Sequence, residues 1–220
     1  MAMVLVTGAN RGIGLELCRA LDARGDSVVA VCRTPSPSLV RLGVRVESGV
    51  DVGDAAKVDA LARALEGTTL DVIINNAGVL GYDALGSIDY DSIHRQLEAN
   101  AIGPLRVTER LLPLVPPGGK IALITSRMGS IADNTSGSMY GYRMSKAALN
   151  MAGSSLARDL KPRGIAVVVL HPGYVRTQMT GNQGSTDAHV AAASLLERID
   201  ELSLETTGRF LHANGETLPW

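Results

Sequence analysis

Aromatic side chains and cysteines are scarce in this chain of 220 residues. Aromatic residues make up only 3% of the sequence, so no stacking platform singles out a ring-shaped substrate. The two cysteines, Cys18 and Cys32, lie in apolar stretches, and two thiols in a chain of this length do not form a disulfide framework. This usage is typical of a reducing compartment, and we expect a cytoplasmic protein.

Long apolar runs and one-sided charge are also missing. No apolar run reaches the length that spans a bilayer, and the run from Met1 to Val6 has neither a basic leader nor a cleavage site. The net charge is −1 and the basic residues are spread along the chain, so neither a nucleic-acid partner nor membrane binding is expected. No cluster of His, Cys and carboxylate residues has metal-ligand spacing, so no metal site is expected.

The chain does contain a regular alternation of strand-like and helix-like segments. The predicted strands cover residues 4–6, 27–32, 44–47, 70–74, 120–124 and 165–170, and the predicted helices cover 15–24, 55–65, 92–112 and 142–160. Apolar runs separated by helices of crossover length are typical of a parallel sheet covered on both faces. We therefore predict a single α/β domain over residues 1–220, a doubly wound parallel sheet of the Rossmann type, with a short mobile substrate loop near 178–187.

A glycine-rich segment, residues 7–14, follows the first predicted strand and opens the first helix. Glycine lets the backbone approach a pyrophosphate, whose charge is then met by amides at the helix N-terminus. The spacing is G-x-x-x-G-x-G and not the general dinucleotide fingerprint, so a structural turn is the alternative. The cofactor-binding residues predicted here are Gly8, Asn10, Arg11, Gly12, Ile13 and Gly14.

The second predicted strand leads into Arg33, at a place where an enzyme that uses NAD often carries an acid for the ribose 2′-hydroxyl. Arg33 can instead pair with the 2′-phosphate of NADP, and Arg11 can reach the same group, since guanidinium donors suit phosphate oxygens. The plain alternative is that both are solvated surface arginines. We expect NADP(H) as the cofactor, with NAD less favoured.

Further cofactor candidates follow the third and fourth predicted strands. The carboxyl ends of parallel strands meet at one edge of the sheet, and ligands bind at that edge in this architecture. An Asn-Asn-Ala-Gly run such as the one after the fourth strand can also be a plain turn. The residues assigned to the cofactor at this edge are Asp51, Val52, Asn75, Ala77 and Gly78.

Two tyrosines compete for the role of catalytic acid, and their spacing separates them. Tyr142 has Lys146 four residues later, on the same helix face, whereas Tyr140 has a methionine there. An ammonium close to a phenol favours the phenolate, so we expect the pKa of Tyr142 to fall from about 10 toward the working pH. Tyr142 is therefore the predicted acid.

The ordered set of motifs resembles the short-chain dehydrogenase/reductase family. The motifs that carry the resemblance are residues 7–14, residues 75–78, Asn100, Ser126, Tyr142 with Lys146, and residues 172–177. Within that family, residues 126–131, 140–150 and 215–220 resemble the subgroup of the sniffer-type carbonyl reductases and the myxobacterial C-factor protein. The resemblance covers nearly the whole chain.

The resemblance implies roles for the residues of the predicted catalytic end. In the family, the tyrosine matching Tyr142 donates a proton to the carbonyl oxygen while hydride arrives from the nicotinamide, and the lysine matching Lys146 also bonds the nicotinamide ribose. Ser126 resembles the serine that holds the substrate carbonyl, with Ser130 and Thr125 as alternatives.

Two further segments gain a role from the resemblance. Asn100 resembles the asparagine that holds a water linking the lysine to solvent, while a helix kink without a catalytic role is the alternative. His171, which lies between the sixth predicted strand and Pro172, is expected to be structural. The segment after the sixth strand resembles the stretch that contacts the nicotinamide, which assigns Pro172, Gly173, Val175 and Thr177 to the cofactor.

The sequence thus predicts an NADP(H)-dependent oxidoreductase that transfers a hydride between nicotinamide and a small-molecule carbonyl or alcohol. The expected reaction is the reduction of a ketone, an aldehyde or a quinone, or the reverse oxidation of an alcohol. The resemblance implies a homo-oligomer, dimer or tetramer, formed through two long helices. The alternative function is a non-catalytic, dinucleotide-binding signalling or regulatory protein of the C-factor type.

Overall fold

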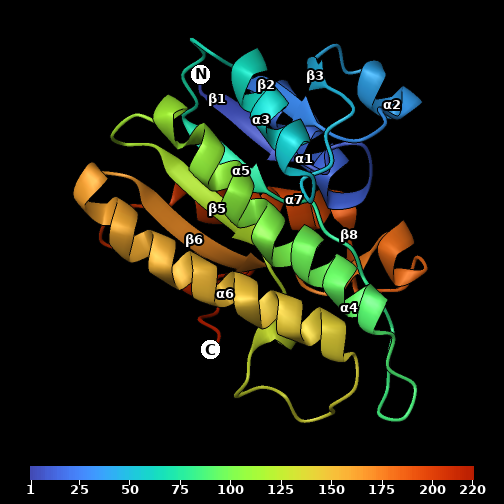
Figure 1. Ribbon diagram of the computed structural model, residues 1–220. Helices are drawn as coiled ribbons and strands as arrows, with labels where there is room; N and C mark the ends of the chain where they lie inside the picture. Colours follow the sequence, from blue (N-terminus) through green and yellow to red (C-terminus); the bar gives the residue numbers. More distant parts are fainter.

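A seven-stranded sheet forms the centre of the computed structural model, which describes residues 1–220 (Figure 1). The strand order is β3-β2-β1-β4-β5-β6-β9, and every neighbouring pair is parallel. Its strands are β1 (Met3–Thr7), β2 (Ser27–Val31), β3 (Arg45–Glu47), β4 (Val72–Asn75), β5 (Lys120–Ile124), β6 (Ala166–His171) and β9 (Phe210–His212). A separate two-stranded ribbon pairs β7 (Val175–Arg176) with β8 (Thr186–Asp187). The predicted doubly wound parallel sheet is confirmed.

Helices cover both faces of this sheet. They are α1 (Gly12–Ala23), α2 (Pro37–Val40), α3 (Ala55–Ala64), α4 (Tyr90–Leu97), α5 (Gly103–Leu111), α6 (Tyr140–Leu160) and α7 (Ala188–Asp200). Figure 1 shows α4, α5 and α6 in front of the sheet, with α1 and α7 behind it. None of the helices combines the length and the apolar composition that a membrane crossing requires.

Strand alternation divides the core into two layers. Val4 and Val6 of β1 belong to the apolar cluster shared with α1 and α7, whereas Leu5 belongs to the cluster shared with α3, α5 and α6. Because both faces of the central strands are buried, their sequences are apolar throughout and do not alternate with polar residues.

All the predicted strands and helices are present, with ends that differ by a few residues. The predicted helix 92–112 is interrupted by a π-helical turn, η1 (Glu98–Ile102). Strand β9 and helix α7 were not predicted, and the three residues of β9 are too few for a periodic pattern. Residues 178–187 were predicted to form a mobile loop, but they contain the 3₁₀ turn η5 (Gln178–Thr180) and strand β8, which pairs with β7.

The sheet topology places the predicted site. The strand order runs outward from β1 to β3 on one side and from β4 to β6 on the other, so the connections diverge between β1 and β4. Ligands in open α/β sheets bind outside the carboxyl ends of the strands at such a switch point. The glycine turn after β1 and the loops after β4, β5 and β6 all lie at this edge.

Candidate active site

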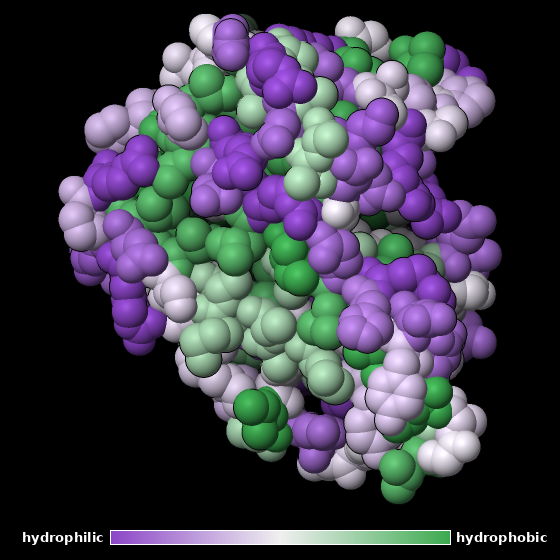
Figure 2. Space-filling view, in the orientation of Figure 1, coloured by the Kyte–Doolittle hydropathy of each residue, from purple (hydrophilic) through white to green (hydrophobic).

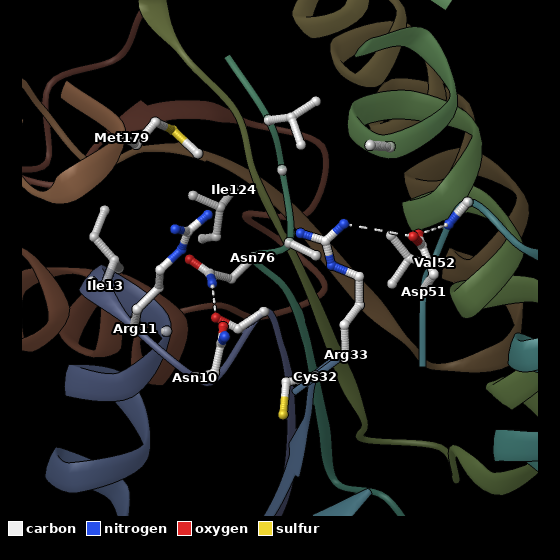
Figure 3. Close-up of a pocket in the computed structure, with 18 of the residues that line it drawn as sticks. Asn10, Arg11, Ile13, Cys32, Arg33, Asp51, Val52, Asn76, Ile124 and Met179 are labelled. Atoms are coloured by element: carbon white, nitrogen blue, oxygen red, sulfur yellow. Dashed lines mark hydrogen bonds and ion pairs between the residues drawn. The ribbon is translucent and has the colours of Figure 1, made fainter. Parts of the chain in front are cut away.

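A cavity of about 560 Å³ opens at the carboxyl edge of the sheet (Figure 3). Most of the predicted site residues line it. They are Gly8, Asn10, Arg11, Gly12, Ile13, Gly14, Arg33, Asp51, Val52, Ala77, Gly78, Tyr142, Lys146, Pro172 and Thr177. The structure therefore brings the predicted cofactor segments and the predicted acid into a single cavity.

The glycine turn forms a floor of the cavity in which Gly8 and Gly14 leave no room for a side chain. A Cβ atom on Gly8, whose φ is +67°, would lie 2.8 Å from the Cα atom of Ala77, and one on Gly14 would collide with the carbonyl oxygen of Gly8. Asn76 ties the turn to the loop after β4, because its Nδ2 donates to the carbonyl of Thr7 at 2.9 Å. The backbone is thus exposed for close approach by a ligand.

Helix α1 begins at this floor without a side-chain cap. Its N-cap residue, Arg11, makes no capping hydrogen bond, whereas helix α3 is capped by the carboxylate of Asp54. The first amides of α1 therefore keep their hydrogen-bonding capacity and their partial positive charge for an anion. The residues present fit a dinucleotide pyrophosphate.

The two arginines proposed for the 2′-phosphate have different partners. Arg33 lies beside Asp51, with 3.7 Å between Nη1 and Oδ2, while Arg11 donates from Nη1 to Oε1 of Gln178 at 2.6 Å. Figure 3 shows the two side chains apart, with Asn76 between them in this view. The Arg33 side chain therefore lies beside Asp51, just after β2, whereas the Arg11 side chain extends toward Gln178 in η5.

Lys146 is buried next to Tyr142, as their spacing predicts. Its Nζ lies 5.8 Å from the centroid of the Tyr142 ring and donates to the carbonyl of Ile124 at 2.9 Å. Only 5% of the Lys146 residue surface is exposed. Burial penalises the ammonium and lowers the pKa of Lys146 to about 8.

The expected pKa shift of Tyr142 was wrong in direction. Burial raises the pKa of Tyr142, a hydrogen bond with Ser126 partly opposes this rise, and the nearby Tyr82 adds to it. The reason is that the ammonium of Lys146 lies over the ring and bonds a backbone carbonyl, so the desolvation of the phenol dominates. Tyr142 consequently holds its proton at neutral pH, which is the state that an acid needs.

Ser126 is the hydroxyl that the structure places beside Tyr142. It follows β5 after Thr125, is buried, and lies near enough to the phenol to lower its pKa, although it does not line the cavity itself. Its Oγ accepts from the amide of Met128 at 3.2 Å. The Ser130 hydroxyl donates instead to the backbone of Trp220 at 3.3 Å. The Thr125 hydroxyl donates to a side chain of α6, the Oδ1 of Asn150, at 2.7 Å. Both alternatives are thus engaged elsewhere.

Asn100 lies inside the π-helical turn η1, fully buried. Its Oδ1 accepts from the amide of Val79 at 2.7 Å, and its Nδ2 donates to the carbonyl of Val79 and the hydroxyl of Ser145, both at 2.9 Å. A Cβ atom on Gly78 would lie 3.0 Å from this Oδ1 and 3.7 Å from the Nζ of Lys146. A π-turn at this place accommodates an asparagine that a regular helix interior disfavours.

Three predicted cofactor residues do not line the cavity. Asn75 is buried with its amide donating to Thr108 of α5 at 3.1 Å, because strand alternation turns it to that face and leaves Asn76 at the cavity. Gly173 and Val175 also lie outside the lining, and Val175 is buried in β7. His171 stacks edge-on against a second histidine with 5.0 Å between ring centroids, in agreement with a structural role.

Sequence reasoning missed much of the cavity wall. The lining residues that were not assigned to the site are Val31, Cys32, Val50, Gly53, Asp54, Asn76, Val79, Arg95, Glu98, Ala99, Ile124, Thr125, Gln178 and Met179. Thr125 was considered only as an alternative to Ser126. Most are ordinary strand or helix residues without a local signal. Asn76 and Gln178 were detectable as direct neighbours of assigned residues.

The chain is similar to known proteins over its full length. A family described as short chain dehydrogenase matches residues 2–188. The chain is 46% identical over 226 residues to the 1-hydroxy-2-glutathionyl-2-methyl-3-butene dehydrogenase of Rhodococcus sp. (strain AD45), with 100% of both proteins covered. It is 49% identical over 154 residues to C-signal of Myxococcus xanthus, covering 69% of this chain and 93% of that protein.

Solved structures agree with this similarity. The carbonyl reductase Sniffer of D. melanogaster superimposes with a TM-score of 0.93 at 31% identity, covering 100% of both chains. The NADPH-bound carbonyl reductase from chicken fatty liver superimposes with a TM-score of 0.91 at 30% identity, covering 100% of this chain and 99% of that one.

Proposed function

Because the chain belongs to the short-chain dehydrogenase family, we propose that it is an NADP(H)-dependent oxidoreductase that reduces the carbonyl of a ketone, an aldehyde or a quinone. The observation that carries this proposal is the pairing of Tyr142 with Lys146 in the cavity that the glycine turn borders. Ser126 lies buried behind the lining, near the phenol of Tyr142. The similarity to carbonyl reductases, one of them NADPH-bound, supports the choice of reaction and cofactor.

Each residue has a distinct task in the proposed reaction. The backbone of the glycine turn and the first amides of α1 hold the pyrophosphate, and Lys146 bonds the nicotinamide ribose. NADPH, when bound, supplies the hydride that adds to the carbonyl carbon. Tyr142 donates its proton to the carbonyl oxygen, so that the alcohol forms without a free alkoxide. Ser126 donates a hydrogen bond to the same oxygen and stabilises its developing charge.

The proton of Tyr142 must then be replaced. Lys146, which lies between the phenol and Asn100, passes a proton to the tyrosine in this proposal. A water molecule that links Lys146 to solvent completes the proposed relay. The side chain of Asn100 already bonds Val79 and Ser145, so in this proposal the water binds to the backbone carbonyl of Asn100. Gly78 leaves room for the Asn100 side chain, because a Cβ atom at this position would lie only 3.0 Å from Oδ1 of Asn100.

A turnover assay tests the proposed function. NADPH oxidation is followed with acetophenone, benzaldehyde and menadione as ketone, aldehyde and quinone probes, and the reverse direction with NADP⁺ and the matching alcohols. The proposal requires hydride transfer to at least one of these classes. Tight NADPH binding without any turnover would contradict it.

A second candidate is a signalling role without catalysis. It is favoured by the 49% identity to C-signal, a protein named for a signal. The intact set of Tyr142, Lys146 and Ser126 favours catalysis, because a purely binding protein does not need a tuned acid. The assay above separates the two candidates.

The preference for NADPH is expected to depend on Arg33. Changing Arg33→Ala removes a charged partner of the 2′-phosphate and is expected to raise the Kd for NADPH by about 10- to 100-fold while leaving that for NADH unchanged. Calorimetric titration of both cofactors measures this effect. Arg41→Ala, at an exposed arginine at the end of α2, is the matched control and should change neither value. Equal turnover of the wild type with NADH and NADPH would contradict the role of Arg33.

We further propose that the protein is a cytoplasmic homo-oligomer. Large apolar side chains are exposed on the helices at the front of the molecule: Ile102, Leu105, Met144 and Met151. Figure 2 shows apolar surface gathered over α5 and α6, bordered by hydrophilic residues, which supports self-association there. Light scattering after gel filtration should give a dimer or a tetramer, and a monomer at micromolar concentration would contradict this.

The cytoplasmic location is supported by the cysteines. Both are free, as is usual in a reducing compartment, and cell fractionation tests the location.

A further inference from the structure

The backbone that leads into the catalytic helix α6 has an unusual conformation. Gly137, Ser138 and Met139 have φ values of +61°, +54° and +51°, so three consecutive residues lie in the left-handed region. Residues other than glycine seldom adopt it, because their Cβ atom crowds the carbonyl oxygen. Met139 is the N-cap of α6 and provides no side-chain cap. The start of this helix therefore needs support from another part of the chain.

Asp83 supplies that support from a loop 57 residues away. Its Oδ1 accepts from the amide of Tyr140 at 2.6 Å, and its Oδ2 accepts from the amide of Gly141 at 3.2 Å. Its backbone carbonyl also accepts from the amide of Met139 at 2.8 Å. These are first-turn amides that have no partner inside the helix. Asp83 is only 8% exposed, so water does not compete well for the same bonds.

The loop that carries Asp83 is itself fixed to the helices around the site. Val79 is held by both polar atoms of the Asn100 side chain, and the amide of Gly81 donates to Oε1 of Gln96 at 2.9 Å. Residues 79 and 81 are thus both tied to the segment formed by α4 and η1, just before the chain reaches Asp83. The carboxylate of Asp83 is consequently a fixed anchor.

Close packing holds the other side of the helix start. A Cβ atom on Gly141 would lie 2.6 Å from Nε2 of Gln96 and 3.0 Å from Cγ1 of Ile93, both in α4, so α6 packs closely against α4 there. Tyr142 follows directly after the two amides that Asp83 binds. The first turn of α6 is thereby held between α4 and the carboxylate, with the phenol projecting from it.

We infer that Asp83 is a positioning residue for the proposed reaction: by bonding the first-turn amides of α6, it holds the phenol of Tyr142 in place beside Ser126 and Lys146. The inference rests on the proposed function, in which Tyr142 is the acid. Asp83 does not line the cavity. Its effect should therefore fall on the proton-transfer step and not on NADPH binding.

The test compares Asp83→Ala and Asp83→Asn with a matched control. Asp71→Ala removes another carboxylate that bonds a distant backbone amide, that of Met3 at 2.7 Å, at the opposite edge of the sheet. Asp83→Ala is expected to lower kcat for the best carbonyl probe by about 100-fold, because a misplacement of about 1 Å has that cost. The Kd for NADPH should not change. Asp83→Asn keeps one acceptor oxygen and should give a kcat between those of Asp83→Ala and the wild type.

Hydrogen exchange provides a readout that does not depend on activity. The amides of Tyr140 and Gly141 should exchange faster in Asp83→Ala than in Asp71→Ala at the same overall stability. If wild-type exchange persists in both Asp83 variants, the inference is overturned even when the enzyme turns over its substrate. If Asp83→Ala does not fold, Asp83→Asn decides: a lowered kcat with unchanged NADPH affinity supports the inference, and a wild-type kcat overturns it. Absence of turnover in the wild type would instead count against the proposed function, and exchange would still decide whether Asp83 holds the helix start.

Discussion

Tyr142→Phe is expected to lower kcat for carbonyl reduction by about 1000-fold while NADPH still binds. The substitution removes only the hydroxyl that would protonate the carbonyl oxygen. Burial raises the pKa of Tyr142, so in the wild type this hydroxyl carries its proton at neutral pH. The ring remains in place over Lys146, and the fold should keep its stability to within about 1 kcal/mol.

A matched control lies two residues earlier on the same helix. Tyr140→Phe also removes one phenolic hydroxyl, but Tyr140 contributes its backbone amide and not its hydroxyl to the helix start. This variant should keep wild-type kcat. Steady-state kinetics combined with NADPH titration measures both variants. Turnover by Tyr142→Phe above about a tenth of the wild-type rate would assign the acid to another group.

Gly14→Ala is expected to weaken NADPH binding by about 100-fold or more, because an added methyl group overpacks the turn that holds the pyrophosphate. Its Cβ atom would collide with the backbone oxygen of Gly8 and would lie 2.6 Å from Nδ2 of Asn76. The backbone of the turn cannot rotate away as a side chain can. The floor of the cavity must therefore open, and Asn76 must release its bond to the carbonyl of Thr7.

Gly25→Ala is the control for this second prediction. Gly25 lies just beyond the other end of α1, has a φ of +84°, and has open space where a Cβ atom would stand. The variant should lose about 1 kcal/mol of stability through backbone strain and still bind NADPH normally. Melting temperatures with and without NADPH distinguish the two glycines. Normal NADPH stabilisation of Gly14→Ala would show that the turn does not hold the cofactor.

Local patterns in the sequence were sufficient for the general arrangement of the site. The glycine turn was recognisable because strand, glycines and helix follow one another within a few residues. The pairing of Tyr142 with Lys146 followed from helical spacing alone, and the structure places their side chains together. Membership of the family, suggested by the order of these motifs, is confirmed by the match over residues 2–188.

Features that depend on burial were not predictable in the same way. The pKa of Tyr142 is raised and not lowered, because the desolvation of the buried phenol has a larger effect on it than the nearby ammonium of Lys146. Asn75 and Asn76 are adjacent in sequence and chemically identical, yet only Asn76 lines the cavity. Which of the two faces inward depends on where β4 ends.

Local sequence patterns were enough for the elements and their order: a parallel sheet, a glycine turn between the first strand and the first helix, and a tyrosine with a lysine on one helix face. These features follow from interactions between residues that are close along the chain. Only the folded chain shows how the tyrosine is held, by Asp83 at 57 residues' distance, and that burial of the ring raises the pKa of Tyr142. Backbone amides and desolvation leave no periodic trace in a sequence, because their partners are chosen only when the chain folds.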